Sequence, residues 1–89
     1  MNDGEPEAER LMALVAQLQG EDPLLTPIQA ALLAAARLAI AQDSRTFARL
    51  LGLSHALVLR ELSMLAGRDR VRIERRDQRT LRTHYALAA

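Results

Sequence analysis

The first half of the chain carries apolar residues at the spacing of amphipathic helices. Four of them recur at i, i+3, i+4 and i+7 and so form one stripe on a helix: Leu11, Leu14, Val15 and Leu18. Pro6 suits the first turn of such a helix, and Gly20 is a stop signal. The pattern predicts a helix over residues 6–19.

The next helix is predicted from a strong start signal. Thr26 can cap a helix, Pro27 fits its first position, and Gln29 completes a capping box. The following residues are apolar almost all round, which predicts a buried helix running to Gln42 in the middle of the fold. A membrane span is disfavoured because this segment contains Gln29 and Arg37 and falls short of about 20 apolar residues.

Two shorter helices joined by a tight turn are predicted next. We expect Ser44 to cap a helix over residues 45–51 and Gly52 to end it. Ser54 is the expected cap of a further helix over residues 54–66. Their predicted inward residues are Phe47, Ala48 and Leu51 in the first helix and Val58, Leu62 and Leu65 in the second. Two helices around a turn with glycine form a helix-turn-helix.

After residue 70 the apolar residues no longer recur at helical spacing but at every second position. Val71 and Ile73 alternate with charged residues. The same alternation returns further on, at Leu81, Thr83, Tyr85 and Leu87. This period predicts two half-buried strands over residues 71–87, joined by a turn at the polar sequence RDQR.

These segments predict a mainly α fold with a small β-hairpin, in the α-α-α-α-β-β order of a winged helix-turn-helix. The 89 residues suit one domain over residues 6–89, preceded by a disordered acidic N-terminus at residues 1–5. Because a fold of this size buries only about 60 to 65 per cent of its unfolded surface, a partner subunit would stabilise it. The acidic start is unlike a signal peptide, so we expect a cytoplasmic protein.

The net charge of +1 hides a strong asymmetry along the chain. Residues 1–43 carry seven acidic residues and two arginines, a net charge of −5, whereas residues 44–89 carry ten arginines and four acidic residues, a net charge of +6. Every basic residue is arginine, whose planar guanidinium binds phosphate and guanine through two parallel hydrogen bonds. The split favours a polyanionic partner for the second half of the chain.

The segment TFARLLGLSHALVLRELSMLAGRDRVRIERRDQRTLRTHYALA resembles the core of the MarR-like (multiple-antibiotic-resistance regulator) winged-helix families of bacteria. LTPIQAALL upstream is similar to their "Leu-Thr, two residues, Gln, three residues, Leu" segment, so the resemblance covers residues 25–87. Two features depart from the pattern. Asp69 and Arg70 stand where those families often have glycine and an apolar residue. Full-length members also flank the core with long dimerisation helices on both sides, whereas this sequence has one N-terminal helix and stops at the wing, so we carry over no effector response.

The resemblance implies sequence-specific binding of double-stranded DNA, with the helix over residues 54–66 as the recognition helix in the major groove. The residues of that helix expected to face DNA are Ser54, His55, Ala56, Leu59, Arg60 and Ser63. Arg60 can bind guanine O6 and N7, and His55 either reads a base or caps the helix. Leu59 could touch a thymine methyl or pack against protein, and Leu57 leaves the same alternatives.

The hairpin over residues 71–87 would then be the wing. Its arginines are expected on the DNA backbone or in the minor groove near the tip (Arg75, Arg76 and Arg79) and on flanking phosphates (Arg72 and Arg82), joined by Arg45 and Arg49 from the preceding helix. The competing interpretation is a merely solvated hairpin, in which Glu74 and Asp77 neutralise neighbouring arginines in cross-strand pairs. Four phosphate contacts per subunit would give a dimer a salt slope of about −7.

We expect a symmetric homodimer built on the helix over residues 6–19, with an interface at Leu11, Leu14, Val15 and Leu18 that presents two recognition helices to half-sites one DNA turn apart. Two histidines and no cysteine offer no metal constellation, and no glycine-rich phosphate loop is present. We therefore expect no enzymatic activity, cofactor or metal. The alternative functions are a protein-docking winged helix that uses Leu57 and Leu59, and a DNA-binding subunit of a plasmid or phage replication or partition system.

Overall fold

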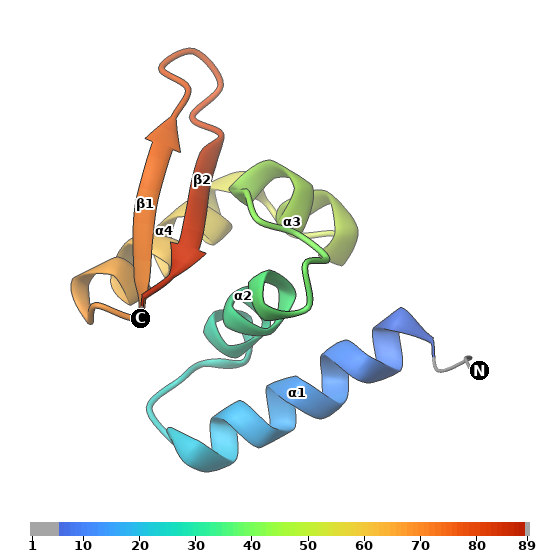
Figure 1. Ribbon diagram of the computed structural model, residues 1–89. Coiled ribbons are helices and arrows are strands. Elements are labelled where there is room, and N and C mark those ends of the chain that lie inside the picture. The colour runs from blue at the N-terminus through green and yellow to red at the C-terminus, as the bar shows by residue number, and fades with distance from the viewer. Residues whose placement is uncertain (1–5, 89) are drawn as a thin grey trace.

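The computed structural model describes residues 6–88. Within them the chain forms four helices, α1 (Glu7–Glu21), α2 (Pro27–Arg37), α3 (Ser44–Leu51) and α4 (His55–Gly67), followed by strands β1 (Val71–Arg76) and β2 (Thr83–Leu87) (Figure 1). The predicted α-α-α-α-β-β winged-helix layout is confirmed. The disorder predicted for residues 1–5 lies outside the described residues.

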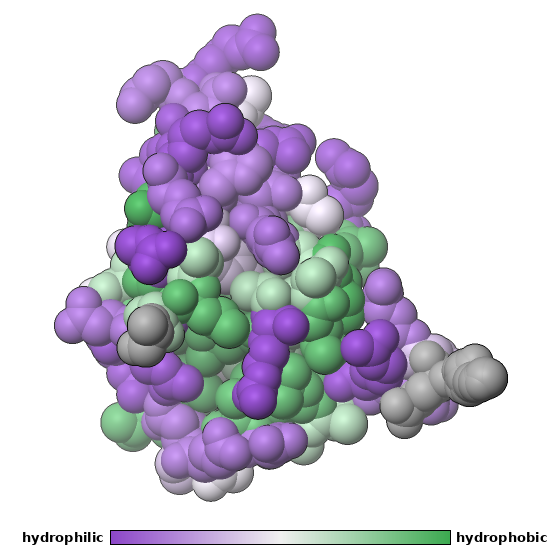
Figure 2. Space-filling model, viewed as in Figure 1, coloured by the Kyte–Doolittle hydropathy of each residue, from purple (hydrophilic) through white to green (hydrophobic). Residues whose placement is uncertain are grey.

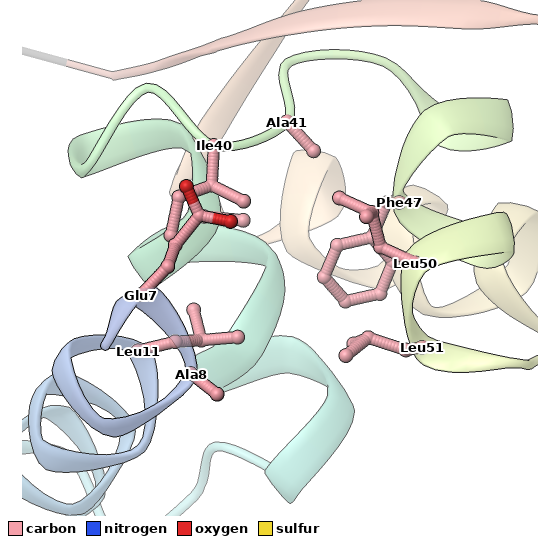
Figure 3. A pocket seen from close by; sticks show the side chains of 9 residues that line it. Glu7, Ala8, Leu11, Ile40, Ala41, Phe47, Leu50 and Leu51 are labelled. Carbon is pink, nitrogen blue, oxygen red and sulfur yellow. The ribbon is translucent and has the colours of Figure 1, made fainter.

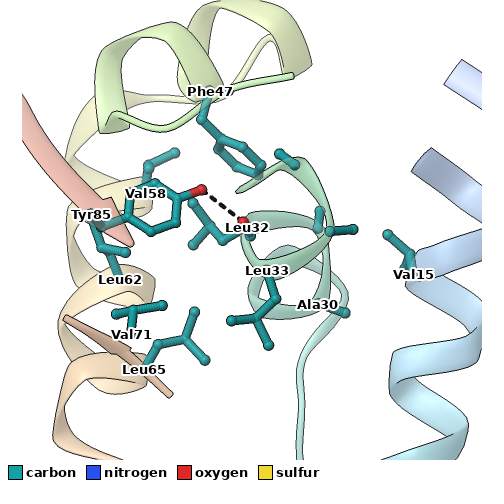
Figure 4. Packing of buried hydrophobic residues seen from close by; sticks show 14 of the residues in the cluster. Val15, Ala30, Leu32, Leu33, Phe47, Val58, Leu62, Leu65, Val71 and Tyr85 are labelled. Atoms are coloured by element: carbon teal, nitrogen blue, oxygen red, sulfur yellow. Dashed lines mark hydrogen bonds between the residues drawn. The ribbon is translucent and has the colours of Figure 1, made fainter. Parts of the chain in front are cut away.

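Helix α2 lies at the centre of the fold, as its apolar sequence predicts. All its residues from Gln29 to Ala35 are buried. On one side α2 meets side chains of α3, α4 and the hairpin, and on the other it meets α1 (Figure 4). The buried Tyr85 hydroxyl donates a hydrogen bond of 2.7 Å to the carbonyl oxygen of Leu32, which ties β2 to α2. Within residues 6–88 no helix has the length and apolar character needed to cross a membrane.

The predicted ends of the first two helices are wrong. Helix α1 continues through Gly20 to Glu21, and α2 ends at Arg37 instead of Gln42. Ala39 has a positive φ of 58°. Its N–H donates to the carbonyl of Ala36 and the N–H of Ile40 to that of Ala35, at 3.1 and 2.8 Å. This is a Schellman motif, and it ends α2 although the sequence stays apolar.

The start signals of the helices are confirmed in two of three cases. The capping box of Thr26 and Gln29 is present, and the Ser54 hydroxyl accepts the N–H of Leu57 at 3.2 Å. For α3 the cap is Asp43, whose carboxylate accepts the N–H groups of two following residues, each at 3.0 Å. Ser44, the predicted cap, is instead the fully buried first residue of α3.

The inward faces of the helix-turn-helix are predicted correctly except at one residue. Phe47 and Ala48 of α3 are buried, as are the three apolar residues assigned to the inner face of α4. Leu51 is 39% exposed because Gly52, at φ 66°, already turns the chain into the next helix there. The N–H of Leu53 then donates to the carbonyl of Ala48 at 2.9 Å, which closes the turn.

The hairpin is antiparallel, and its turn is longer than predicted, covering residues 77–82. Leu81 lies in that turn at φ 63° and is 46% exposed, so it does not continue the inward row of Thr83 and Tyr85. Leu87, at the end of β2, is also exposed. Of the predicted inward residues, Val71, Thr83 and Tyr85 are buried.

Strand β1 carries one extra residue, which shifts the register of the hairpin. Ile73 pairs with Tyr85, but the next pairs are Arg75 with His84 and Arg76 with Thr83. Glu74 is therefore left without a partner on β2, as in a β-bulge. Because paired residues share a face of the sheet, the bulge puts Arg76 on the face of the buried Thr83, and Arg75 on the opposite face.

Candidate nucleic-acid interface

Helix α4 divides into a buried face and an accessible one. Val58, Leu62 and Leu65 are buried, and Glu61 is buried with its carboxylate accepting a hydrogen bond of 2.9 Å from the Thr26 hydroxyl. The predicted DNA-facing positions Ala56, Arg60 and Ser63, and the cap Ser54, are exposed. The Arg60 side chain is 71% exposed and lies 3.9 Å from the Glu61 carboxylate, too far to restrain it strongly. Its guanidinium remains accessible to a ligand.

A groove runs between α4 and the wing. Its lining comes from α4 and from the hairpin: Leu59, Arg60, Ser63, Arg76 and Leu81. Leu59 is half-buried and lines this groove, and Leu57 is half-buried as well. Arg76 reaches the groove because of the β-bulge, and its Nε donates to the Thr83 hydroxyl at 3.0 Å. Two guanidinium groups thus converge where α4 meets the wing.

The arginines near the tip of the wing differ in their surroundings. Arg75 lies on the outer face, with its guanidinium 3.0 Å from His84 Nε2. Arg79 is exposed and makes no ion pair with any residue from 6 to 88. Figure 2 shows hydrophilic residues gathered over the wing at the top of the view. The tip is therefore a polar surface with accessible positive charge.

Two other wing arginines are paired with carboxylates of the same chain. Arg72 lies 3.1 Å from Glu74, and Arg82 lies 3.4 Å from Asp43. The first pair is exposed, and exposed ion pairs contribute only about 0 to 1 kcal/mol, so a phosphate can compete for that guanidinium. Asp43 is buried, and its pairing makes Arg82 a weaker candidate for a phosphate contact than the sequence indicates. Glu74 therefore pairs with an arginine of its own strand, and the predicted cross-strand pairing of Glu74 is not formed.

Asp77 orders the turn at the wing tip through backbone hydrogen bonds and does not neutralise a neighbouring arginine. The Asp77 carboxylate accepts the N–H groups of Arg79 and Thr80 at 2.8 and 2.9 Å. These hydrogen bonds, that of Thr80 first, lower the pKa of Asp77. Arg45 of α3 donates from its guanidinium to the Thr80 carbonyl at 3.2 Å. The wing tip and α3 are therefore connected before any ligand binds.

His55 is tied to a buried hydroxyl group at the start of α4. Its Nε2 lies 2.7 Å from Ser44 Oγ, and that oxygen also accepts the backbone N–H of Thr83 at 2.9 Å. Burial lowers the pKa of His55, the charges of Arg45 and Arg82 lower it further, and Asp43 opposes them. Half of the ring's hydrogen-bonding capacity is therefore used inside the protein. Ser44 and Asp43 are the residues of this region that the sequence interpretation missed as connecting groups.

The predicted dimer stripe is part of the core of a single chain. Leu11, Val15 and Leu18 are buried against the rest of the fold, and Leu14 is half-buried. Other apolar groups are accessible nearby. An apolar groove lies between α1, the end of α2 and α3, where Leu50 and Leu51 face Leu11 (Figure 3). A dimer through α1 would need the side chains of Leu50 and Leu51 or another exposed side chain, such as that of Met12, which is 63% exposed.

Comparison with known proteins adds no family assignment. The chain matches no protein-family model and no curated protein. The similarity to MarR-like regulators therefore stays a prediction.

Proposed function

We propose that the protein binds double-stranded DNA sequence-specifically and acts in the bacterial cytoplasm, on the nucleoid, as a small dimeric transcriptional regulator. One observation carries this proposal: the accessible face of α4 and the arginines of the wing meet at one groove, lined by Arg60 from the helix and Arg76 from the strand. A helix presented by a helix-turn-helix can enter the major groove while an adjoining hairpin lies along the backbone.

The roles of the residues follow from their exposure. Arg60 is the strongest candidate for reading guanine, because its side chain is 71% exposed on the outer face of α4. Ser63 and Ala56 lie on the same accessible face and would contact base edges or a thymine methyl. Arg75 and Arg79 would bind phosphates or enter the minor groove, since they are accessible at the tip.

The homodimer belongs to the same proposal. A two-fold axis would place two α4 helices in successive major grooves, about 34 to 36 Å apart, and the operator would be palindromic. With Leu11, Val15 and Leu18 occupied inside the chain, the side chains available to the dimer are the exposed ones of α1 and the groove beside it. The small size of the fold adds a thermodynamic reason for association.

The proposal is tested by selecting binders from a pool of random DNA duplexes, followed by sequencing, at low and near-physiological salt. The wild type is compared with Arg75→Ala/Arg79→Ala and with the charge-matched control Arg10→Ala/Arg37→Ala on α1 and α2. We expect a palindromic motif for the wild type and control. The wing variant should bind this motif more weakly, with a salt slope reduced by about 1.8 per subunit, at roughly 0.9 per lost phosphate contact.

No enrichment at either salt concentration, or equal behaviour of the two double variants, would contradict DNA binding by this surface. A protein-docking function would then be favoured by the apolar groove of Figure 3, where Leu50 is 54% exposed. Binding of a protein partner through leucines would tolerate salt, whereas binding of DNA phosphates weakens steeply with it.

A further inference from the structure

A shallow depression lies between α3 and the start of α4, apart from the groove at the wing. Its charged and polar lining comes from Arg45, Arg49 and His55, with Ala48 and Leu53 as its apolar part. Arg45 and Arg49 are one helical turn apart on α3, so both guanidinium groups emerge on the same side as the imidazole. Three nitrogen-rich side chains from two elements therefore share one concave surface.

The two positive charges of this depression are not neutralised by carboxylates in the described part of the chain. Arg49 makes no ion pair with any residue from 6 to 88, and Arg45 donates to an uncharged carbonyl, that of Thr80. The carboxylate nearest in sequence is Asp43. It is buried, accepts three hydrogen bonds from the first turn of α3 and pairs with Arg82. The depression thus attracts an anion.

The hydrogen bonds around Ser44 decide which nitrogen of His55 carries a proton. Ser44 Oγ accepts the N–H of Thr83, and its own proton needs an acceptor because the residue is fully buried. His55 Nε2, at 2.7 Å, is that acceptor, which requires an unprotonated Nε2. A neutral imidazole then carries its proton on Nδ1. The ring is held as a neutral donor, and its Nδ1–H, which makes no hydrogen bond with residues 6–88, is available to a ligand.

We infer that this depression is a binding site for a single phosphate group, held by Arg45 and Arg49 as charged donors and by His55 Nδ1–H as a neutral donor. Guanidinium groups pair with phosphate oxygens through charge-assisted hydrogen bonds, and the imidazole supplies a donor that carries no charge of its own. The inference rests on the proposed function, since a phosphodiester of the DNA backbone would be the ligand. His55 would then position the backbone instead of reading a base.

The first test uses the full chain labelled with ¹⁵N, with no substitution. Long-range ¹H–¹⁵N spectra should show His55 in the Nδ1–H form. Addition of inorganic phosphate, and separately of the selected DNA duplex, should shift the signals of His55 Nδ1 and Arg49 Nε. Signals of Arg10, on α1, serve as the internal control and should not move with either ligand.

The second test compares Arg49→Gln with Arg10→Gln in binding to the same duplex. Loss of one charge-assisted contact should weaken binding roughly tenfold and reduce the salt slope by about 0.9 per subunit. Arg10→Gln should leave both unchanged. The fold of each variant is checked by its unfolding midpoint in urea.

The outcomes separate the two proposals. If the duplex binds but His55 does not shift and Arg49→Gln behaves as Arg10→Gln, the phosphate site is wrong and DNA binding stands. If no duplex binds, the proposed function fails. In that case a shift of His55 with inorganic phosphate would support a site for free phosphate, and no shift would overturn the inference.

Discussion

A single buried hydroxyl group connects three elements of the proposed DNA-binding half. Ser44 is the first residue of α3, its partner Thr83 begins β2, and its partner His55 begins α4. Ser44 and Thr83 are both fully buried, so water does not readily replace the hydrogen bond between them. Ser44 Oγ is therefore one of the atoms that fix the position of the hairpin relative to α4.

We predict that Ser44→Ala destabilises the protein by about 1 to 3 kcal/mol, because it leaves the buried N–H of Thr83 without an acceptor. The free energy of unfolding in urea measures this. Ser63→Ala is the matched control, since Ser63 is exposed on α4 and should change the free energy of unfolding by less than about 0.5 kcal/mol. Equal effects of the two substitutions would show that the hydroxyl contributes nothing specific.

Residue roles are predictable from the sequence where the deciding contact is local. The capping box of Thr26 and Gln29 and the cap at Ser54 follow from spacings of three residues, and both are confirmed. At Asp43 and Ser44 two good capping residues are adjacent, so local preference cannot choose between them. The choice is made by Thr83, which is 39 residues away and needs the serine hydroxyl.

At the scale of elements, the two turns that end α2 and α4 share one geometry without a glycine. Ala39 and Asp69 both have a positive φ, 58° and 59°, and each follows its helix as the left-handed residue of a Schellman motif. After α4, the N–H of Asp69 donates to the carbonyl of Ala66 and that of Arg70 to Leu65, at 3.0 and 2.9 Å. Asp69 thus adopts the conformation for which glycine is the usual residue.

Ala39, just after the end of α2, is a position where a change to glycine should stabilise the protein. A left-handed conformation costs an ordinary residue about 1 to 2 kcal/mol, and glycine in exchange loses more entropy on folding, about 0.5 to 1 kcal/mol. Ala39→Gly should therefore stabilise the protein by roughly 0.5 to 1 kcal/mol, measured as a rise in the free energy of unfolding. The exposed Ala39 makes no side-chain contact that this change would remove from the core.

Ala13→Gly is the control for this substitution. Ala13 is exposed in the middle of α1, where the same replacement should destabilise by about 0.5 to 1 kcal/mol. If both variants lose stability, the positive φ at Ala39 carries no strain and the interpretation of the turn is wrong. The opposite signs of the two changes make the comparison independent of any general effect of glycine.

Helix α2 and the hairpin show where the sequence fails to predict the boundaries and the register of an element. The apolar run after residue 37 continues without glycine or proline, so nothing in it signals that α2 ends. In the hairpin, alternation predicts both strands, but one inserted residue shifts the phase of β1 and places Arg76, in place of Arg75, on the face of Thr83. Such a shift depends on pairing between the strands and is not visible in either strand alone.

At the scale of the whole molecule, the acidic and basic halves of the chain are joined by ion pairs. Asp22, in the loop after α1, binds Arg68 at 2.8 Å and also Arg70, both in the turn between α4 and β1. Asp43 is paired with Arg82 across a similar sequence distance. Part of the charge asymmetry therefore holds the two halves together, and the remaining arginines of residues 44–89 are those of the proposed interface.

These ion pairs predict a loss of stability in acid. The hydrogen bond from Arg68 is the main cause of the lowered pKa of Asp22; the pKa of Asp43 is raised by burial but lowered more by its hydrogen bonds and Arg82. A carboxyl with a lowered pKa in the folded state contributes stability above its ordinary value of 3.8, and this is lost as the pH falls through the folded pKa. Urea midpoints should fall steeply below about pH 4.

Asp22→Asn isolates one of the contributions. It should lower the urea midpoint at pH 7, and its difference from the wild type should vanish at the lowest pH, where Asp22 is protonated in both states. Asp69→Asn is the control, because Asp69 makes no ion pair with residues 6–88. A difference for Asp22→Asn that persists unchanged in acid would assign the effect to packing.

The order of elements, the central position of α2 and the accessible face of α4 follow from periodicity and hold for the whole molecule. Periodicity does not decide whether a given apolar stripe packs within the chain or against a second subunit. The stripe of α1 fits a dimer interface and an internal contact equally well, and the structure buries Leu11, Val15 and Leu18 within one chain. Only the three-dimensional placement of α1 on α2 separates the two uses.

The bulged hairpin also affects how the protein behaves at high concentration. On one side of the small sheet, Tyr85 donates its N–H to the carbonyl of Gln42 and His84 forms a bridge with Asp43, so the outer edge of β2 is already covered. The other edge, β1, carries Arg72, a bulge at Glu74 and further arginines, all features that oppose strand addition. Fibrillar stacking through this sheet is thereby disfavoured, and the hairpin can stay exposed at high protein concentration.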